Sequence, residues 1–260
     1  MPEVSVIVTT FNRPALLEET LNSILGQTFT DFELIVVDNF SNYDFHHLVS
    51  KLNDGRVIGY QNANDGVIAI NRNFGFQRAS GNYIALCDDD DLWEPDKLEG
   101  QLAVFKRHPS VSLVCTASSF IGGLPDSFFR TITSSLLRTV LALNVIPAKY
   151  SLMNIGFITN SSVLFRKQIL KRVGKLNESA DIRSVEDYDF WLRISRQHKI
   201  YFLNRKLVRY RVHQAQVSSG NIADTKRKVA QVINNQWNEL TGLQKWLFRL
   251  TNRRAAQQTG

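Results

Sequence analysis

The 260-residue sequence contains only two cysteines, Cys87 and Cys115, and both stand in apolar runs. Two thiols are too few for the disulfide framework of a secreted protein, so we expect the protein to reside in a reducing compartment. No stretch approaches the roughly 18 consecutive apolar residues of a membrane span, and the start Met1-Pro2-Glu3 lacks the basic region of a secretory signal. We therefore expect a soluble, cytoplasmic protein.

The sequence also lacks the common phosphate and metal motifs. It contains neither G-x-x-x-x-G-K-[ST] nor G-x-G-x-x-G, which excludes the P-loop and the dinucleotide fingerprint. The absence of H-E-x-x-H, C-x-x-C and G-x-S-x-G argues against a zinc hydrolase, a redox pair and an α/β-hydrolase. If the protein binds phosphates, a divalent ion must do much of that work, together with a side chain such as Arg72.

Acidic residues become scarce after residue 100. Residues 1–100 contain 16 acidic and 6 basic side chains, whereas residues 101–260 contain 8 acidic and 25 basic ones. This asymmetry indicates an acid-lined site in the first part and an anionic partner for the second, unless it is only a drift of solvated charge. The basic residues are scattered and no aromatic-basic module accompanies them, so no nucleic-acid partner is expected.

Short apolar, β-branched runs alternate with helical patterns through the first 117 residues. The runs predict strands at Val4–Val8, Phe32–Val37, Val57–Tyr60, Tyr83–Leu86 and Val111–Cys115. The helical patterns are Pro14–Leu25, Phe45–Leu52, Val67–Arg78 and Pro95–Lys106. The alternation predicts an α/β fold with a mostly parallel central sheet and helices on both faces.

The rhythm changes after Ser118. We predict a short helix at Leu136–Leu143, strands at Ser162–Phe165 and Ile200–Leu203, and a helix at Glu186–Gln197. The chain is thus expected to form one α/β domain in two halves, residues 1–117 and 118–223, with a helical extension over 224–260. The segment Trp237–Arg254 combines apolar residues near helical spacing with basic residues. Such a helix lies on a membrane surface or packs against the domain or a second subunit.

Polar residues follow three of the predicted strands: Thr9 to Asn12, Asp38-Asn39, and the four aspartates Asp88 to Asp91. Ligands of open α/β sheets bind beyond the carboxyl ends of the strands. Adjacent aspartates repel unless a cation or hydrogen bonds offset their charge, and carboxylates are preferred ligands of Mg²⁺ and Mn²⁺. If the chain stays extended, Asp88 and Asp90 face one side and Asp89 and Asp91 the other. The alternative is a solvated acidic loop or a helix cap before Pro95.

Five segments in matching order resemble the family 2 glycosyltransferases of the GT-A fold. VSVIVTTFNR at Val4–Arg13 is similar to the family's VSVIIPTYNR, and ELIVVDNFS at Glu33–Ser41 is similar to EIIVVDDGS. GNYIALCDDDDLW at Gly81–Trp93 resembles GEYIAFLDxDDxW, which contains the metal-binding DXD. The other two matches are Leu21–Thr28 with SLLNQT and Asn64–Gly75 with NxGxxxARNxG. The resemblance extends from Val4 to about Ser218.

The resemblance implies roles for residues of the first half. Thr9 and Phe11 match positions that contact the nucleobase and ribose, Asp38 matches an acid that contacts the base, and Arg72 an arginine near the base and phosphates. Asp88 and Asp90 match the two acids of the DXD motif, of which the first faces the ribose or the sugar and the second binds the metal, Mn²⁺ or Mg²⁺. Asp89, between them, is also assigned to the nucleotide-sugar site. Two positions depart from the pattern: Phe11 lacks the usual tyrosine hydroxyl, and Asn39 replaces a second aspartate.

Transfer with inversion needs a second acid to accept the proton of the acceptor hydroxyl. The segment Ser184–Arg193 resembles the family's EDxDxxLR, in which the aspartate after the glutamate is the proposed base. This implies Asp187 as the base, with Glu186 positioning or binding the acceptor. Helical spacing places Glu186 beside Asp189 and turns Asp187 elsewhere. The alternative is an ordinary acidic first turn of a helix.

Three further residues receive roles from the resemblance. YRVHQ at Tyr210–Gln214 is similar to YRxHxxxxS, completed by Ser218, so His213 binds the diphosphate or the metal, or is an ordinary structural histidine. Trp93 shapes the sugar pocket or belongs to the core. Asn160 lies where the family has a loop that faces the acceptor.

These features predict an inverting, metal-dependent glycosyltransferase. Its expected substrates are a nucleotide diphosphate sugar, with UDP as the nucleotide, and a glycan or lipid-linked saccharide of cell-surface polysaccharide synthesis. A peripheral position on the inner face of the membrane is compatible with the C-terminal segment. A sugar-phosphate nucleotidyltransferase is the first alternative, although Thr9–Pro14 has no glycine for its N-terminal loop. A non-catalytic nucleotide-binding scaffold is the second, and the intact acids argue against it.

Overall fold

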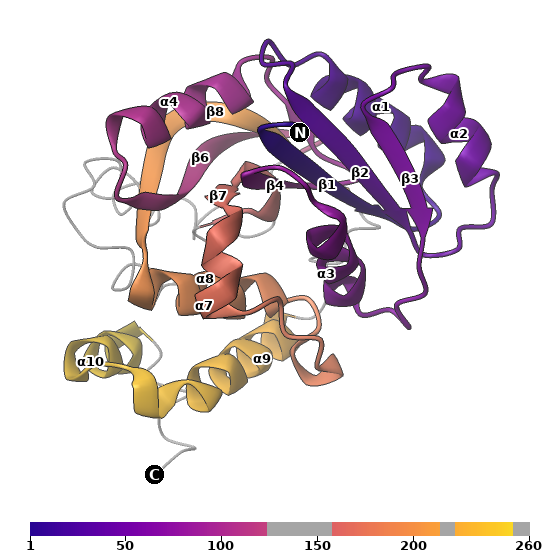
Figure 1. The fold of residues 1–260 in the computed structure, drawn as a ribbon. Helices are drawn as coiled ribbons and strands as arrows, with labels where there is room; N and C mark the ends of the chain where they lie inside the picture. Colours follow the sequence, from indigo (N-terminus) through magenta and orange to yellow (C-terminus); the bar gives the residue numbers. More distant parts are fainter. Residues whose placement is uncertain (124–157, 214–221, 252–260) are drawn as a thin grey trace.

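The computed structural model describes residues 1–123, 158–213 and 222–251. Within them, eight strands form one curled sheet in the order β3-β2-β1-β4-β7-β6-β8-β5 (Figure 1). In chain order the strands are β1 Val4–Thr10, β2 Phe32–Asp38, β3 Val57–Gln61, β4 Tyr83–Asp88, β5 Leu92–Trp93, β6 Val111–Ile121, β7 Leu164–Arg166 and β8 Lys199–Arg211.

Parallel pairing brings three polar strand ends to one edge of the sheet. The neighbours β3, β2, β1 and β4 are all parallel, and the register pairs Thr10 with Asp38 and Thr9 with Asp88. β7 is antiparallel to both β4 and β6, β8 is parallel to β6, and β5 is antiparallel to β8. The prediction of a mostly parallel sheet with helices on both faces is therefore confirmed.

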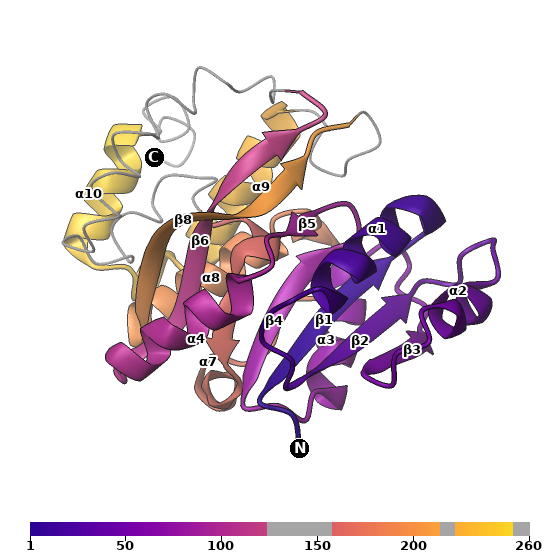
Figure 2. The same cartoon turned by 90° about the horizontal axis from the view of Figure 1, so that it is seen from above.

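One face of the sheet is covered by α1 Pro14–Leu25, α2 Phe45–Lys51 and α4 Lys97–Arg107 (Figure 2). Val4, Val6 and Val8 alternate along β1 toward this face, as period-two strand geometry requires, and join a buried cluster with Leu17 and Leu21 of α1. α1 begins at a proline, which suits the first helical turn because its missing N–H is not needed there.

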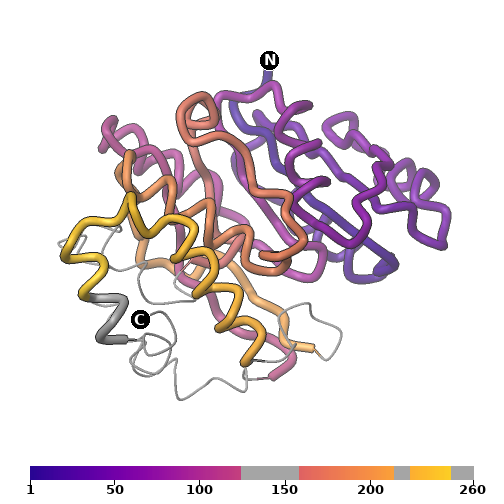
Figure 3. Tube along the Cα trace, turned by 90° about the horizontal axis from the view of Figure 1, so that it is seen from below, coloured from indigo at the N-terminus to yellow at the C-terminus, as the bar shows by residue number. Residues whose placement is uncertain are grey.

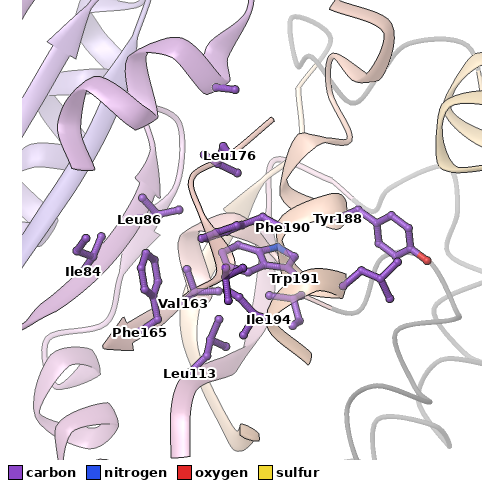
Figure 4. Close-up of a cluster of buried hydrophobic side chains, with 14 of the residues drawn as sticks. Ile84, Leu86, Leu113, Val163, Phe165, Leu176, Tyr188, Phe190, Trp191 and Ile194 are labelled. Carbon is purple, nitrogen blue, oxygen red and sulfur yellow. The ribbon is translucent and has the colours of Figure 1, made fainter. Parts of the chain in front are cut away.

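The opposite face is covered by α3 Ile68–Arg78 and α8 Glu186–Gln197, with the short α7 Leu170–Val173 beside α8, and α9 Ile222–Asn235 packs against α8 on the side away from the sheet. Phe165 of β7 and Phe190 of α8 lie with ring centroids 5.9 Å apart in this core, next to Trp191 (Figure 4). The side chains of α8 therefore fix the helix, and its acidic first turn, against the middle of the sheet.

Several boundaries differ from the predicted ones. The predicted strand at Ser162–Phe165 starts only at Leu164, because Asn160–Ser162 forms a 3₁₀ turn. β6 and β8 extend beyond the predicted runs by pairing with each other, so the expected division after residue 117 falls inside β6. Further 3₁₀ turns are Lys167–Ile169, Ala180–Ile182 and Trp237–Glu239. The helix predicted at Leu136–Leu143 lies outside the described residues.

The C-terminal extension is not the continuous helix predicted over Trp237–Arg254. The chain forms a 3₁₀ turn at Trp237–Glu239, extends at Leu240, and begins α10 (Gly242–Thr251) after it. Leu240 is buried against the core, whereas Leu243 and Trp246 of α10 are 50% and 55% exposed. Burial of Leu240 thus interrupts the helix. α9 and α10 lie on the side of the molecule away from the N-terminus (Figure 3). Within the described ranges, no helix combines the length and apolar character needed to cross a bilayer.

Candidate active site

The four aspartates do not continue the extended strand. β4 ends at Asp88, and Asp89 and Asp90 form a turn before β5. Both turn residues bind the same guanidinium: Arg13 Nη1 lies 3.0 Å from Asp89 Oδ1 and 2.9 Å from Asp90 Oδ2. The condition under which alternate aspartates would face opposite sides, an extended chain past Asp88, is therefore not met.

Burial changes the acidity of these two carboxyls. It raises the pKa of Asp89 to about 6, although Arg13 and the Thr10 hydroxyl, which donates at 2.8 Å, oppose the shift. Burial and the charge of Asp88 raise the pKa of Asp90, with His213 and Arg13 opposing. His213 Nε2 lies 3.0 Å from Asp90 Oδ2, so two residues predicted as candidate metal ligands lie next to each other.

Asp91 has a different environment from its neighbours. It is 1% exposed, accepts a hydrogen bond from the Ser161 hydroxyl at 2.5 Å, and accepts the Arg211 backbone N–H at 3.0 Å. Burial raises its pKa well above the usual range for an aspartate. Asp91 thus connects β5, β8 and the turn at Asn160–Ser162.

Arg72 of α3 joins the strand edge to the start of α8. Its Nη2 donates to Asp88 Oδ1 and its Nη1 to Glu186 Oε1, both at 2.7 Å, and the arginine is 5% exposed. Asn160 Nδ2 also donates to Asp88 Oδ1, at 2.8 Å. Residues from three distant segments of the chain therefore meet at the Asp88 carboxylate, and Arg72 links this group to a fourth segment through Glu186.

The first turn of α8 brings two acids toward Arg72. Asp187 has its pKa raised to about 7 by burial and by the neighbouring Glu186, while Arg72 and the Tyr188 N–H favour its charged form. Asp189 lies elsewhere: Arg193 Nε donates to it at 2.9 Å, and Gln236 Nε2 at 2.5 Å. Glu186 and Asp189 are three residues apart on α8 as predicted, but their carboxylates have different partners, Arg72 and Arg193.

Three buried oxygen atoms around Asp88 have no hydrogen-bond partner within the part of the chain that the structure describes. They are Thr9 Oγ1, Asn160 Oδ1 and Glu186 Oε2, on residues that are 5%, 6% and 4% exposed. Buried polar atoms are nearly always hydrogen-bonded, to protein, water or ligand. Two of the three oxygens can only accept hydrogen bonds, which suits a ligand rich in hydroxyl groups.

The predicted base-binding residues lie at the ends of β1 and β2. Phe11 is 51% exposed, so its ring is accessible for stacking. Asp38 is fully buried: its carboxylate accepts hydrogen bonds from the Ser41 hydroxyl, from the Ser41 N–H at 2.9 Å and from Gln61 Nε2 at 3.0 Å. In this arrangement the Asp38 carboxylate braces the loop after β2.

The indole of Trp93 is 1% exposed, and its Nε1–H donates to the Ser161 carbonyl at 3.0 Å. This burial favours the core interpretation of Trp93 over a pocket wall. Sequence reasoning gave no role to Arg13, Ser161 or Arg211, all of which contact the aspartates. Only the position of Arg13 just after a polar strand end could have indicated it.

A divalent ion was predicted at the aspartates. In the described residues, no group of three or more His, Cys, Asp or Glu side chains surrounds a common metal position. Mg²⁺ is commonly bound by one or two carboxylates together with substrate phosphates. Oδ2 of Asp88 and Oδ1 of Asp90 accept none of the hydrogen bonds of this network. These two carboxylate oxygens are of the kind that a hard cation prefers.

Comparison with known proteins agrees with this geometry. The family model "Glycosyl transferase family 2" matches residues 5–174. The chain belongs to this family. The matched residues include the strand edge and the aspartates Asp88 to Asp91, and the match ends before the first turn of α8.

Two curated relatives match most of the glycosyltransferase chain. TuaG of Bacillus subtilis, named for teichuronic acid biosynthesis, is 30% identical over 87% of this chain and 85% of its own length. WfaP of Escherichia coli, named as a UDP-Glc:α-D-GlcNAc-diphosphoundecaprenol β-1,3-glucosyltransferase, is 26% identical over 88% and 84%. This chain spans only 66% and 31% of the length of uncharacterized glycosyltransferases from Rickettsia typhi and Rickettsia bellii.

The fold is that of solved GT-A glycosyltransferases. A structure of Staphylococcus aureus TarS in complex with UDP-GlcNAc matches 95% of this chain and 70% of its own, with a TM-score of 0.73 and 21% identity. At this identity the match supports the GT-A fold, and the predicted fold class is confirmed.

Proposed function

We propose that this family 2 glycosyltransferase transfers a hexose, with inversion, from a UDP-sugar to a hydroxyl of a glycan or lipid-linked saccharide. The product belongs to a cell-surface polysaccharide. The UDP and lipid-linked substrates are supported by the activity for which WfaP is named and by the UDP-GlcNAc bound to TarS, proteins that are 26% and 21% identical to this chain. The polysaccharide assignment is supported by TuaG and WfaP.

The double ion pair of Arg72 carries this proposal. One guanidinium contacts Asp88 at the strand edge and Glu186 at the start of α8, both at 2.7 Å. A transferase must bring a donor and an acceptor together, because proximity and orientation supply much of the rate enhancement. The bridge keeps an acid-lined donor edge next to a second, separate pair of acids.

The chemistry assigned to the residues follows from their environments. Asp187, with its pKa raised to about 7, accepts the proton of the acceptor hydroxyl near neutral pH. The oxygen then forms a bond to the anomeric carbon while the bond from that carbon to the diphosphate breaks. Glu186 Oε2 and Asn160 Oδ1 accept hydrogen bonds from sugar hydroxyls, which satisfies their unpaired oxygens. Arg13 and Arg72 offset negative charge at the donor edge.

Asp88, Asp90 and His213 are the residues that would bind a divalent ion, Mn²⁺ or Mg²⁺, and such an ion stabilises negative charge on a departing diphosphate. The contact of His213 with Asp90, at 3.0 Å, supports its inclusion. Phe11, 51% exposed, supplies a stacking surface for the base next to Thr9.

The proposed location is the cytoplasmic face of a membrane. Leu243 and Trp246 of α10 are half-exposed, and Lys245 lies between them in the sequence. Apolar side chains beside basic ones favour the surface of an anionic bilayer. A lipid-linked acceptor would make such contact useful.

Screening nucleotide sugars tests this function. UDP-sugars should raise the melting temperature in the presence of Mn²⁺, and one of them should release UDP when a saccharide acceptor is added. Stabilisation by nucleoside triphosphates with sugar phosphates, and none by nucleotide sugars, would instead favour a nucleotidyltransferase.

A further inference from the structure

Lys97, the first residue of α4, is completely buried. Its side chain is 0% exposed, its Nζ lies 3.7 Å from the centroid of the Trp93 ring, and it donates to Gln101 Oε1 at 2.9 Å. The contact with Trp93 has the geometry of a cation–π interaction. None of the motif roles assigned to the aspartates, Arg72 or His213 uses this lysine.

Burial of this lysine destabilises the folded state. Among the described residues no carboxylate forms an ion pair with it, and burial lowers its pKa to about 7. Its position at the start of a helix also opposes a positive charge, because the helix dipole is positive there. A methionine of similar length would fill the space without these costs. Residues that burden a fold in this way are concentrated at functional sites.

The first partner of Lys97 leads to the aspartates. The Trp93 indole N–H donates to the Ser161 carbonyl at 3.0 Å. The Ser161 hydroxyl in turn accepts the Asp88 backbone N–H at 3.0 Å and donates to Asp91 at 2.5 Å. The orientation of the Trp93 ring therefore affects the position of the strand end.

The second partner leads to the same 3₁₀ turn. Gln101 Nε2 donates to the carbonyls of Ser162 and Val114, both at 2.9 Å. Because the two carbonyls can only accept hydrogen bonds, the Gln101 amide NH₂ must face them, and the amide oxygen then faces Lys97 Nζ and accepts its hydrogen bond. Lys97 thus fixes two side chains that both contact the turn at Asn160–Ser162.

We propose that Lys97 is a positioning residue for the donor site. Through Trp93 and Gln101 it fixes the turn at Asn160–Ser162, so that Asn160 and Ser161 keep Asp88 oriented toward the donor. The proposal rests on the proposed glycosyl transfer, because the donor site is defined by it. Lys97 itself touches neither substrate nor reacting atoms.

The test compares Lys97→Met with Lys106→Met, an exposed lysine of the same helix. Both variants should fold with the wild-type circular dichroism spectrum, and Lys97→Met should unfold in urea at no lower concentration than wild type. Its kcat should nevertheless fall by about 10²-fold, the order expected when a distant change misplaces reacting groups. Lys106→Met should keep the wild-type kcat. The urea comparison needs no substrate.

Two further experiments test whether Lys97 acts on the donor site through Trp93 and Ser161. Trp93→Phe keeps a ring over Lys97 but removes the donor to Ser161, and its kcat should fall as well. Lys97→Met should reduce kcat much less in the Ser161→Ala background than in wild type, because both changes act on the same turn. A control pair of Lys106→Met with Ser161→Ala should be additive.

Wild-type kcat in Lys97→Met or in Trp93→Phe would overturn the proposal. So would a Lys97→Met variant that unfolds at clearly lower urea, because the lysine would then be a stabilising core residue. In each of these cases wild-type transfer shows that the proposed function stands. Absence of any transfer by wild type would instead refute the proposed function, and the urea comparison would still decide whether the lysine burdens the fold.

Discussion

Replacing Arg72 by methionine should separate the two acid groups of the site. The arginine side chain is 6% exposed and its partner Glu186 is 5% exposed, so the change leaves a buried carboxylate without its cation. Breaking a buried ion pair from one side costs about 3–5 kcal/mol. The contact to Asp88 adds less, because that side chain is 30% exposed and reaches water. We expect a loss of about 3–5 kcal/mol in the free energy of unfolding at pH 7.5.

Urea unfolding measures this loss, and pH provides a second check. Without Arg72, whose charge lowers the pKa of Asp187, the folded-state pKa of this carboxyl rises further above its unfolded value, so the folded variant binds more protons than its unfolded chain. Its stability should therefore increase when pH falls from 7.5 to 5.5, and the deficit relative to wild type should shrink. The control is Arg205→Met, which removes an ion pair with Asp96 in which the two side chains are 48% and 41% exposed. This change should lower the free energy of unfolding by at most about 1 kcal/mol. A similar small loss for Arg72→Met would refute the reasoning.

Three other outcomes are expected. The transfer rate should fall about tenfold per pH unit below about 7, because Asp187 must be deprotonated to accept a proton; a flat profile from pH 5.5 to 8 would exclude it as the base. Asp90→Ala should reduce UDP affinity in Mn²⁺ to the value measured in EDTA, and equal wild-type affinity in both solutions would remove the metal role. Trp246→Ser, at a 55% exposed position, should weaken sedimentation with anionic vesicles; unchanged binding would indicate that α10 packs against another surface.

The sequence predicted correctly those helices and strands whose ends are set by neighbouring residues. α1 begins and ends at Pro14 and Leu25 as predicted, since a proline marks its first turn and a glycine follows it. The strand ends at Thr9 and Asp88 meet because parallel pairing places them side by side. These two kinds of evidence were sufficient for the fold class and for the edge of the sheet at which the polar strand ends gather.

The remaining features depend on contacts between distant residues. Arg72 and Glu186 are 114 positions apart, and nothing in either segment indicates the other. Arg13 reaches Asp89 and Asp90 only because the chain turns after Asp88, which the aspartate run itself did not reveal. The C-terminal helix is broken because Leu240 is buried in the core, a tertiary effect that outweighs helical periodicity.

The central claim is that Asp187 serves the acceptor while a separate edge binds the donor, and Asp187→Asn tests it most directly. Transfer from a UDP-sugar and UDP affinity are measured for wild type and variant at pH 7.5. The substitution keeps the shape of the side chain but removes the proton acceptor. We expect transfer to fall by about 10²–10⁴-fold while UDP affinity stays unchanged. Transfer at the wild-type rate, or loss of UDP binding, would contradict the claim.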